Sequence, residues 1–282
     1  MWRLGNGARL VTRVNVGTLA KAGYAARGVV FLLVAAMALF SGLAGGRPDT
    51  KSALSTLLDQ PLGRVWVGTI GLGLLGFVAW RLAQSLADSD GHGSGSKALA
   101  IRAALLGSAL AYIGLASFAI SHALSAGGGG QSSGEQSLAR WIMSQPYGAY
   151  LAVVVGLGFI IGGVMTSMKG LTRKFEKYLH LPDRKGFIRL VCIYGLVARG
   201  IVFALTGLLF AYAGITVDPD QAGSMSDALT WLRQLPFGAL LYILVSLGLA
   251  AFGLYNLVEA RYRVVHGPSL NDVKKAVVIP RP

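Results

Sequence analysis

The chain has 282 residues, of which 54% are hydrophobic and 13% are charged, and its mean hydropathy is +0.58. Soluble domains carry about 25% charged residues, so this composition excludes an ordinary soluble domain and indicates a membrane protein. The formal net charge of +14 occurs without a DNA-binding motif, and we expect no nucleic-acid partner, because attraction to anionic lipid headgroups accounts for basic residues beside a membrane.

Six apolar stretches are long enough to cross the roughly 30 Å hydrocarbon core of a bilayer. In chain order they are residues 24–45, 65–83, 104–125, 147–168, 190–216 and 238–258. The first stretch starts late, runs long and has no small-residue cleavage site, so we expect it to stay in the membrane rather than to be removed as a signal peptide. The predicted fold class is therefore an all-α membrane protein with six transmembrane helices.

Lys and Arg residues are distributed unequally between the two sides of the predicted spans. Most of them lie before the first span, after the second and fourth spans, and in the tail that follows the sixth span. The connections on the opposite side carry only Arg47, Lys51, Arg64, Arg140 and Arg233. By the positive-inside rule, we expect both termini in the cytoplasm and anionic membrane lipids against the cytoplasmic face.

Residues 71–76 read GLGLLG, which matches the G-x-G-x-x-G spacing of a dinucleotide-binding turn. Such a turn needs a strand before it and a helix that opens on it. Here the motif lies inside an apolar span, and two later spans carry the similar strings GLGFIIG and SLGLAAFG. These glycines are therefore interpreted as packing positions, where the missing side chain lets another helix approach closely.

Three segments of the chain align without gaps from a proline, namely Pro61, Pro146 and Pro236. Each proline is followed by a glycine two residues later and by another glycine twelve residues later. The first set is Gly63, Gly148 and Gly238, and the second set is Gly73, Gly158 and Gly248. The second set lies within apolar spans, so these three glycines are the predicted helix-packing residues.

The span that precedes each proline segment also repeats. YAARGVVFLLV (24–34) and LVARGIVFALTG (196–207) share Ala-Arg-Gly, which places Arg27 and Arg199 at equivalent positions. LGSALAYIGLA (106–116) fits the same frame, with Ser108 in place of the arginine. Each repeat is thus expected to be a two-helix hairpin, and three hairpins of one orientation predict a pseudo-threefold axis along the membrane normal.

The expected organisation follows from these repeats. It is a cytoplasmic N-terminal segment (1–19), repeat 1 (20–87), repeat 2 (97–170), a cytoplasmic amphipathic linker (171–187), repeat 3 (188–260) and a basic C-terminal tail (261–282). In the linker, LTRKFEKYLH places Leu171, Phe175, Tyr178 and Leu179 at helical spacing, which predicts a short amphipathic helix on the membrane surface. Trp66, Trp80, Trp141 and Trp231 lie near span ends, as in an aromatic belt.

The repeated motifs resemble a bacterial family of triplicated two-helix membrane domains known as domain of unknown function 1206. The resemblance rests on Ala-Arg-Gly at 26–28 and 198–200, on the segments before the three prolines, and on the glycines after them. It covers about residues 20–260. It implies a six-helix fold in the bacterial cytoplasmic membrane, and it supplies no activity.

Residues that carry chemistry are sparse. No Asp or Glu lies within the six stretches, Glu259 being just past the last one, which disfavours cation-coupled transport. The single cysteine and four scattered histidines form no metal-ligand pattern, and no catalytic set occurs at useful spacing, so we expect no enzymatic activity, cofactor or metal. Arg27 and Arg199 remain, either as anchors that extend to lipid phosphates and helix-end carbonyls, or as a basic ring that attracts anions.

Two functions are consistent with these features. The favoured one is a non-catalytic membrane scaffold that binds lipids or an unidentified protein partner. The alternative is a passive channel or carrier for a small neutral or anionic solute along the pseudo-threefold axis, with Arg27, Arg199 and hydroxyls such as Ser108 and Thr206 along the path.

Overall fold

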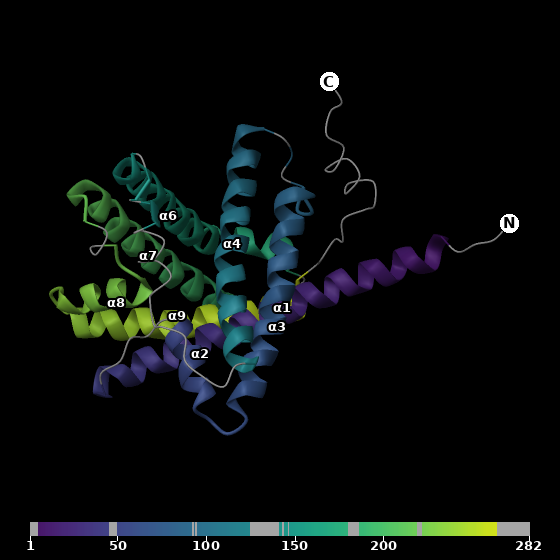
Figure 1. Ribbon diagram of the computed structural model, residues 1–282, viewed down its shortest axis with the longest axis horizontal. Coiled ribbons are helices and arrows are strands. Elements are labelled where there is room, and N and C mark those ends of the chain that lie inside the picture. Colours follow the sequence, from purple (N-terminus) through teal and green to yellow (C-terminus); the bar gives the residue numbers. More distant parts are fainter. Residues whose placement is uncertain are drawn as a thin grey trace.

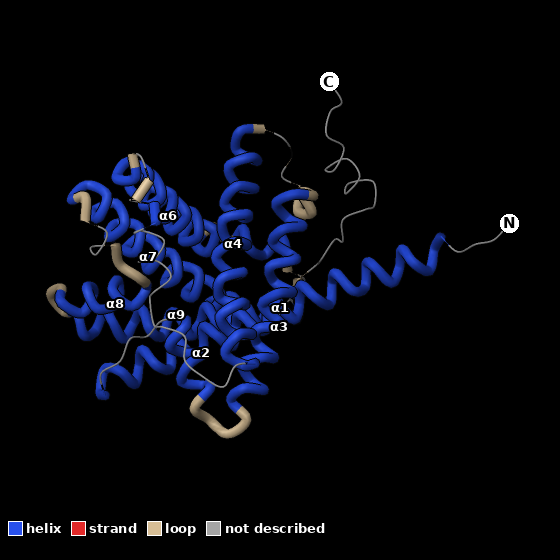
Figure 2. The backbone as a smooth tube through the Cα atoms, viewed as in Figure 1, coloured by secondary structure: helices blue, strands red, loops and turns tan. Residues whose placement is uncertain are grey.

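The computed structural model is built almost wholly of helices over the residues that it describes (Figures 1 and 2). The described residues are 5–44, 50–91, 93, 95–124, 141–142, 144–145, 147–179, 186–218 and 222–263. Six of the helices within these ranges are long and apolar enough to cross a membrane. The predicted all-α fold with six spans is therefore confirmed, and the chain is a multi-pass membrane protein.

Each repeat contributes two of the six long helices. Repeat 1 contains α1 (Gly5–Ala44) and α3 (Gly63–Leu86), with the short helix α2 (Thr50–Leu58) between them. Repeat 2 contains α4 (Ser96–Leu124) and α6 (Gly148–Leu171).

Repeat 3 contains α7 (Gly186–Thr216) and α9 (Gly238–Tyr262), with α8 (Met225–Gln234) between them. The start of α8 is set by its sequence. Ser224 and Asp227 form a capping box, in which each side chain accepts a hydrogen bond from the other residue's backbone N–H.

The second helix of every repeat begins with the same backbone conformation. Leu62, Tyr147 and Phe237 precede α3, α6 and α9 with φ values of 61°, 62° and 59°, in the left-handed region. A glycine follows each of them as the first helical residue. A Cβ at Gly63 or Gly238 would press on carbonyl oxygens of the preceding segment, so the turn requires glycine there. Of the three prolines, Pro61 and Pro236 lie at these turns, and Pro146 lies outside the described residues.

The six long helices pack in a cyclic order that follows the repeats. Helix α3 packs on α4, α6 on α7, and α9 on α1, so the second helix of each repeat contacts the first helix of the next, and repeat 3 contacts repeat 1. Within repeats, α1 packs on α3 and α7 packs on α9. Figure 1 shows the α1 and α9 pair along the long axis, with α3 and α4 running steeply across it.

The contact between α6 and α7 is made at glycines spaced seven residues apart. Gly156 and Gly163 on α6 face Gly207 and Gly200 on the antiparallel α7. A Cβ at Gly156 would lie 2.7 Å from the Gly207 carbonyl oxygen, and one at Gly207 would lie 2.6 Å from the Gly156 carbonyl oxygen. The two backbones therefore touch directly, which is how helices gain packing energy in lipid, where apolar burial supplies no drive.

The two predicted packing glycines of the outer repeats also lie at helix contacts. A Cβ at Gly73 would lie 2.6 Å from the Cβ of Ala26 on α1, and a Cβ at Gly248 would collide with the Cβ of Ala198 on α7. Gly158, the equivalent residue of repeat 2, departs from this pattern. No described heavy atom lies within 4 Å of a Cβ placed there. Its helix contacts α7 through the neighbouring Gly156 instead.

The predicted two-helix hairpin of repeat 2 differs from the other two. Over their described lengths, α4 and α6 do not pack along each other, although both helices belong to one repeat. No described heavy atom lies within 4 Å of a Cβ placed at Gly107 on α4 or at Gly158 on α6. The cyclic order of helices is thus open at this one place.

The linker after α6 differs from the predicted amphipathic helix over its described residues. Lys174–Tyr178 forms a 3-10 turn labelled η1, and residues 180–185 lie outside the described part of the chain. Phe175 and Leu179 are buried, and the Phe175 ring lies edge-on to Tyr255 of α9. Leu179 also forms a β-bridge with Arg263. Phe175 and Leu179 therefore pack on the end of α9, whereas Leu171 at the end of α6 is exposed.

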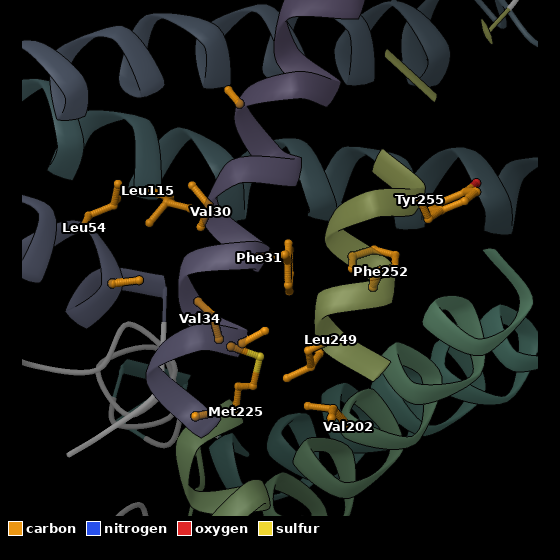
Figure 3. Close-up of a cluster of buried hydrophobic side chains, with 14 of the residues drawn as sticks. Val30, Phe31, Val34, Leu54, Leu115, Val202, Met225, Leu249, Phe252 and Tyr255 are labelled. Atoms are coloured by element: carbon orange, nitrogen blue, oxygen red, sulfur yellow. The ribbon is translucent and has the colours of Figure 1, made fainter. Parts of the chain in front are cut away.

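The main hydrophobic core lies between α1 and α9 and extends to the short outer helices. In Figure 3, Phe31 of α1 points toward Phe252 of α9, and Met225 of α8 lies near Val34. The Phe31 and Phe252 rings are perpendicular, with centroids 4.9 Å apart. Repeats 1 and 3 are joined through this aromatic pair.

A pair of substitutions in α6 tests the backbone contact with α7. We expect Gly156→Ala to destabilise the protein by about 1 to 3 kcal/mol, because the new methyl group must displace the α7 backbone. The matched change Gly158→Ala meets open space and should be neutral, or stabilising by about 0.5 to 1 kcal/mol through helix propensity. Unfolding of both variants in mixed micelles measures the difference, and equal effects would contradict the packing described here.

Candidate functional site

Arg27 and Arg199 converge on the same aromatic pair in the core. They occupy equivalent positions on α1 and α7. The Cζ atom of Arg27 lies 5.7 Å from the centroid of Phe31 and 5.0 Å from that of Phe252. The Cζ atom of Arg199 lies 5.1 Å and 5.8 Å from the same two centroids. The structure therefore brings together the two arginines that the repeats marked, although 172 positions separate them in the chain.

Arg27 is enclosed by aromatic side chains from four helices. Besides Phe31 and Phe252, its guanidinium lies 5.0 Å from the Phe77 centroid on α3 and 5.3 Å from the Tyr112 centroid on α4. Its residue is only 8% exposed. Cation-π attraction in such a desolvated place contributes about 2 kcal/mol, because the ring faces carry negative charge density. The aromatic enclosure therefore holds the Arg27 side chain inside the protein, and its contact with a lipid phosphate or another anion stays a prediction.

The hydrogen bonding of Arg27 is incomplete. Its Nε donates to the Tyr112 hydroxyl at 2.6 Å. No residue in the described part of the chain accepts a hydrogen bond from Nη1 or Nη2, and no described carboxylate forms an ion pair with this guanidinium. A planar guanidinium offers five N–H donors and matches carboxylate or phosphate oxygens in pairs. The arrangement can therefore bind an oxyanion through the two terminal nitrogens.

Arg199 supplies a second positive charge beside this site. Its Cζ lies 3.5 Å from the centroid of Phe203, one turn further along α7. The side chain is half-buried. Two guanidinium groups that share Phe31 concentrate positive charge beside it, and charges in a low-dielectric interior interact strongly. The pair thus favours binding of a negatively charged group.

The equivalent position in repeat 2 holds a different residue. Ser108 of α4 stands where the other repeats have arginine, and one turn later Tyr112 stands where they have Phe31 and Phe203. The Tyr112 hydroxyl is the acceptor for Arg27, and its ring meets Phe77 edge-on at 4.7 Å. The aromatic position of repeat 2 therefore completes the surroundings of the repeat 1 arginine.

A second polar cluster lies at the ends of α3 and α9. Arg263 donates from Nη1 to Glu259 at 2.6 Å and from Nη2 to Asp90 at 3.2 Å. Gln84 donates to the same Asp90 oxygen at 2.6 Å. Glu259 and Arg263 are 4% and 6% exposed, so this is a buried ion-pair network. It ties the end of α9 to α3 and to the loop that follows it.

Arg263 stays positively charged within this network. Burial by itself lowers the pKa of the guanidinium, but the nearby Tyr24, Glu259 and Asp90 raise it, and the net result is a pKa above its usual value. The Arg263 guanidinium also lies 5.1 Å from the Tyr24 centroid and 5.9 Å from that of Trp80. It is therefore held by both opposite charges and aromatic faces.

This second cluster was missed by reasoning from the sequence. Asp90 lies in the glycine-rich stretch DSDGHGSGS, which is typical of a flexible connector. Trp80 was predicted to join an aromatic belt, but it is 1% exposed and donates a hydrogen bond to the Tyr24 hydroxyl at 3.2 Å. The usable signal was the i, i+4 spacing of Glu259 and Arg263, which favours an ion pair on a helix.

Neither cluster resembles a metal centre. Among the residues with described positions, no three His, Cys, Asp or Glu side chains are placed to hold a metal ion. The buried Cys192 of α7 lies in the apolar core. The chemistry that this arrangement offers is thus the binding of an anion by arginine.

Comparisons with known proteins agree with the repeated architecture. A family model described as Domain of Unknown Function (DUF1206) matches the chain three times, over residues 22–88, 103–173 and 194–263. The chain is also similar to "Uncharacterized protein YxxB" of Bacillus subtilis (strain 168), with 31% identity over 259 residues, which is 89% of this chain and 93% of that protein. No solved structure matches.

Removal of the Tyr112 hydroxyl tests the hydrogen bond to Arg27. We expect Tyr112→Phe to lower the free energy of unfolding by about 1.5 to 3 kcal/mol, the usual range for a hydrogen bond to a charged group. Tyr212→Phe is the matched control, because Tyr212 lies on α7 with an exposed side chain, and it should change stability by less than about 0.5 kcal/mol. Thermal unfolding in detergent compares the two variants, and a Tyr112→Phe effect no larger than the control would show that the bond is absent.

Neutralisation of Glu259 tests the buried network. We expect Glu259→Gln to destabilise the protein by about 3 kcal/mol or more, because Arg263 loses one partner of a buried pair. Glu176→Gln serves as the control, since Glu176 pairs with Arg189 at 2.7 Å but the two side chains are 29% and 44% exposed. Exposed pairs contribute about 0 to 1 kcal/mol. Denaturant titrations of both variants should therefore differ clearly, and similar midpoints would refute the burial of the Glu259 pair.

Proposed function

The chain belongs to the DUF1206 family, and from its cation-rich interior we propose that it is a non-catalytic protein of the bacterial cytoplasmic membrane that binds the phosphate of an anionic lipid at Arg27. The family match and the Bacillus subtilis relative support a bacterial membrane. The unequal distribution of Lys and Arg supports cytoplasmic termini. Neither the comparisons nor the fold names a ligand, so the ligand class is inferred from the site.

One observation carries this proposal. Arg27 is buried, yet among the described residues its terminal nitrogens have no hydrogen-bond acceptor and no carboxylate lies at ion-pair distance, although the charge of Glu259 acts on it from further away. An arginine at the centre of a membrane span costs about 2.5 to 3.5 kcal/mol even on insertion scales that allow relaxation. The aromatic rings offset part of that cost. A bound phosphate would offset the remainder, because it provides two oxygens for Nη1 and Nη2.

Arg27 lies deep in the apolar span of α1, so a lipid headgroup that binds it must move inward from its usual plane at the membrane surface. The apolar span of α1 runs from Gly17 to Phe40. Arg27 lies ten residues after Gly17, which is about 15 Å along the helix. A free anion would have to cross the same distance without a tail to hold it in the membrane. A lipid phosphate, by contrast, stays in the bilayer while a basic group draws it inward.

The proposal distinguishes a scaffold that binds lipid from a pathway that conducts a solute. A passive pathway for small anions would use the same two arginines. It would then also give a flux of chloride or phosphate across liposomes, and that flux would depend on Arg27. A lipid-binding protein should show no such flux.

Lipid retention measured by native mass spectrometry tests the proposal. The purified protein would be mixed with phosphatidylglycerol, with phosphatidylcholine, and separately with inorganic phosphate. We expect Arg27→Gln to weaken phosphatidylglycerol binding about tenfold, which corresponds to the roughly 1.4 kcal/mol of one charged hydrogen bond. Arg64→Gln removes the same charge from an exposed position of α3 and should leave binding unchanged.

Three results would contradict the proposal. Equal phosphatidylglycerol retention by the two variants would remove Arg27 from the site. Binding of inorganic phosphate with equal or higher affinity would make the ligand a free anion. A chloride or phosphate flux in liposomes that Arg27→Gln abolishes would favour the passive pathway.

A further inference from the structure

The middle repeat contains two helix faces that have no partner among the residues with described positions. Among the six spans, α4 and α6 are the least buried, with 22% and 17% of their most apolar windows enclosed, against 56% for α1 and for α9. No heavy atom of the described chain lies within 4 Å of a Cβ placed at Gly107 or Gly114 on α4, or at Gly158 or Gly162 on α6. These four glycines are interior helical residues, and each weakens its helix unless a close approach requires it.

Repeats 1 and 3 show what such positions do. In repeat 1, Gly73 of α3 approaches Ala26 of α1, and Gly23 of α1 approaches the Phe77 backbone. In repeat 3 the equivalent contacts recur, between Gly248 and Ala198 and between Gly195 and the Phe252 backbone. Two copies of the repeat therefore use the same two pairs of positions to join their first and second helices.

Repeat 2 carries small residues at all four equivalent positions. Counted from Ser108, the first-helix positions are Ala104 and Gly107. Counted from Pro146, the second-helix positions are Gly158 and Gly162. The contacts that join the other two repeats are therefore sterically allowed here, and they allow a closer approach of the backbones than in either of the other repeats.

The cyclic packing order leaves room for one more contact. Every pairing of a second helix with the next first helix is made, including the one between α9 and α1. Of the pairings within repeats, only the one between α4 and α6 is missing over the described residues. Since α4 is held by α3 and α6 is held by the glycines of α7, the two pairs can move toward each other as units.

We propose that α4 and α6 pack on each other in a second, closed arrangement of the protein, through Gly107 with Gly158 and Ala104 with Gly162. This contact completes the cycle of six helices. It encloses Ser108 and Tyr112 together with Arg27 and Arg199. The gap between α4 and α6 in the open arrangement is then the lateral entrance to these residues from the lipid. The exposed face of α4 is covered by α6, and that of α6 by α4, because the two helices of repeat 1 and the two helices of repeat 3 cover each other in this way.

Disulfide trapping in native membranes tests this inference. The natural Cys192 is first replaced by alanine, and a protease site is inserted into the stretch between residues 125 and 139. Gly107→Cys and Gly158→Cys are then combined in this background and oxidised. We expect the two fragments to stay linked after cleavage, because irreversible trapping collects even an arrangement that is populated at about 1%.

The matched control is the equivalent pair of repeat 3, Ala198→Cys with Gly248→Cys, which is already in contact. In this control the protease site is inserted into the connection between α7 and α8, so that cleavage separates the two cysteines. Should that variant not fold, Ala26→Cys with Gly73→Cys of repeat 1 replaces it, with the protease site between α1 and α2. The single variant Gly107→Cys reports on contacts between copies. Because the readout is a covalent link, it does not depend on lipid binding, and its failure is distinguishable from failure of the proposed function.

Each outcome decides the inference. A link within one chain, at an extent within about tenfold of the control, supports the closed arrangement. A link only between two chains would show that a second copy covers the face, and would overturn it. No link at 107 and 158 while the control pair links would show that lipid fills the gap permanently, and would overturn it as well.

Discussion

Direct contact between helix backbones is the constraint on which the rest of this structure depends. Lipid tails are as apolar as leucine, so helices in a membrane gain little by burying leucine against one another. They gain by making many short-range van der Waals contacts, and glycine permits these because it has no side chain. The α6 and α7 pair shows the extreme case, because Gly156, Gly163, Gly200 and Gly207 bring the two backbones to within contact of each other. Elsewhere, Gly73 and Gly248 meet alanines of the neighbouring helices, and the helices are joined there as well.

The buried cations follow from the same close packing. Once α1, α7 and α9 are drawn together, the equivalent arginines of repeats 1 and 3 both lie close to the Phe31 and Phe252 rings. Aromatic faces then replace water around the guanidinium groups. In the buried network, both terminal nitrogens of Arg263 pair with carboxylates, of Glu259 and Asp90, whereas Arg27 has aromatic neighbours and one hydroxyl. That difference separates a structural cluster from a site with capacity for a ligand.

Most of the fold could be predicted from the sequence, because the three repeats carry the same pattern of apolar spans, prolines and glycines. The six spans, the family, and the turns before Gly63 and Gly238 follow from hydropathy and from the proline register. The site could be predicted only in part. The alignment of repeats 1 and 3 identified Arg27 and Arg199 as equivalent residues. Their convergence on Phe31 depends on the packing of α9 against α1, which no local sequence pattern specifies. Asp90 and Trp80 were misread for the same reason, since a glycine-rich loop and a span-end tryptophan acquire their roles only from the helix that happens to lie opposite.

The central claim is that three copies of one helix pair enter the membrane the same way round and pack cyclically. Labelling of single cysteines tests it most directly. Leu62, Tyr147 and Phe237 are exposed at the equivalent left-handed turns before α3, α6 and α9, and each can be changed to cysteine in a Cys192→Ala background. An impermeant maleimide added to intact cells should label all three, whereas the same reagent added outside inverted vesicles, where it reaches only the cytoplasmic face, should label none of them. Labelling of any one of the three from the opposite side would contradict the claim.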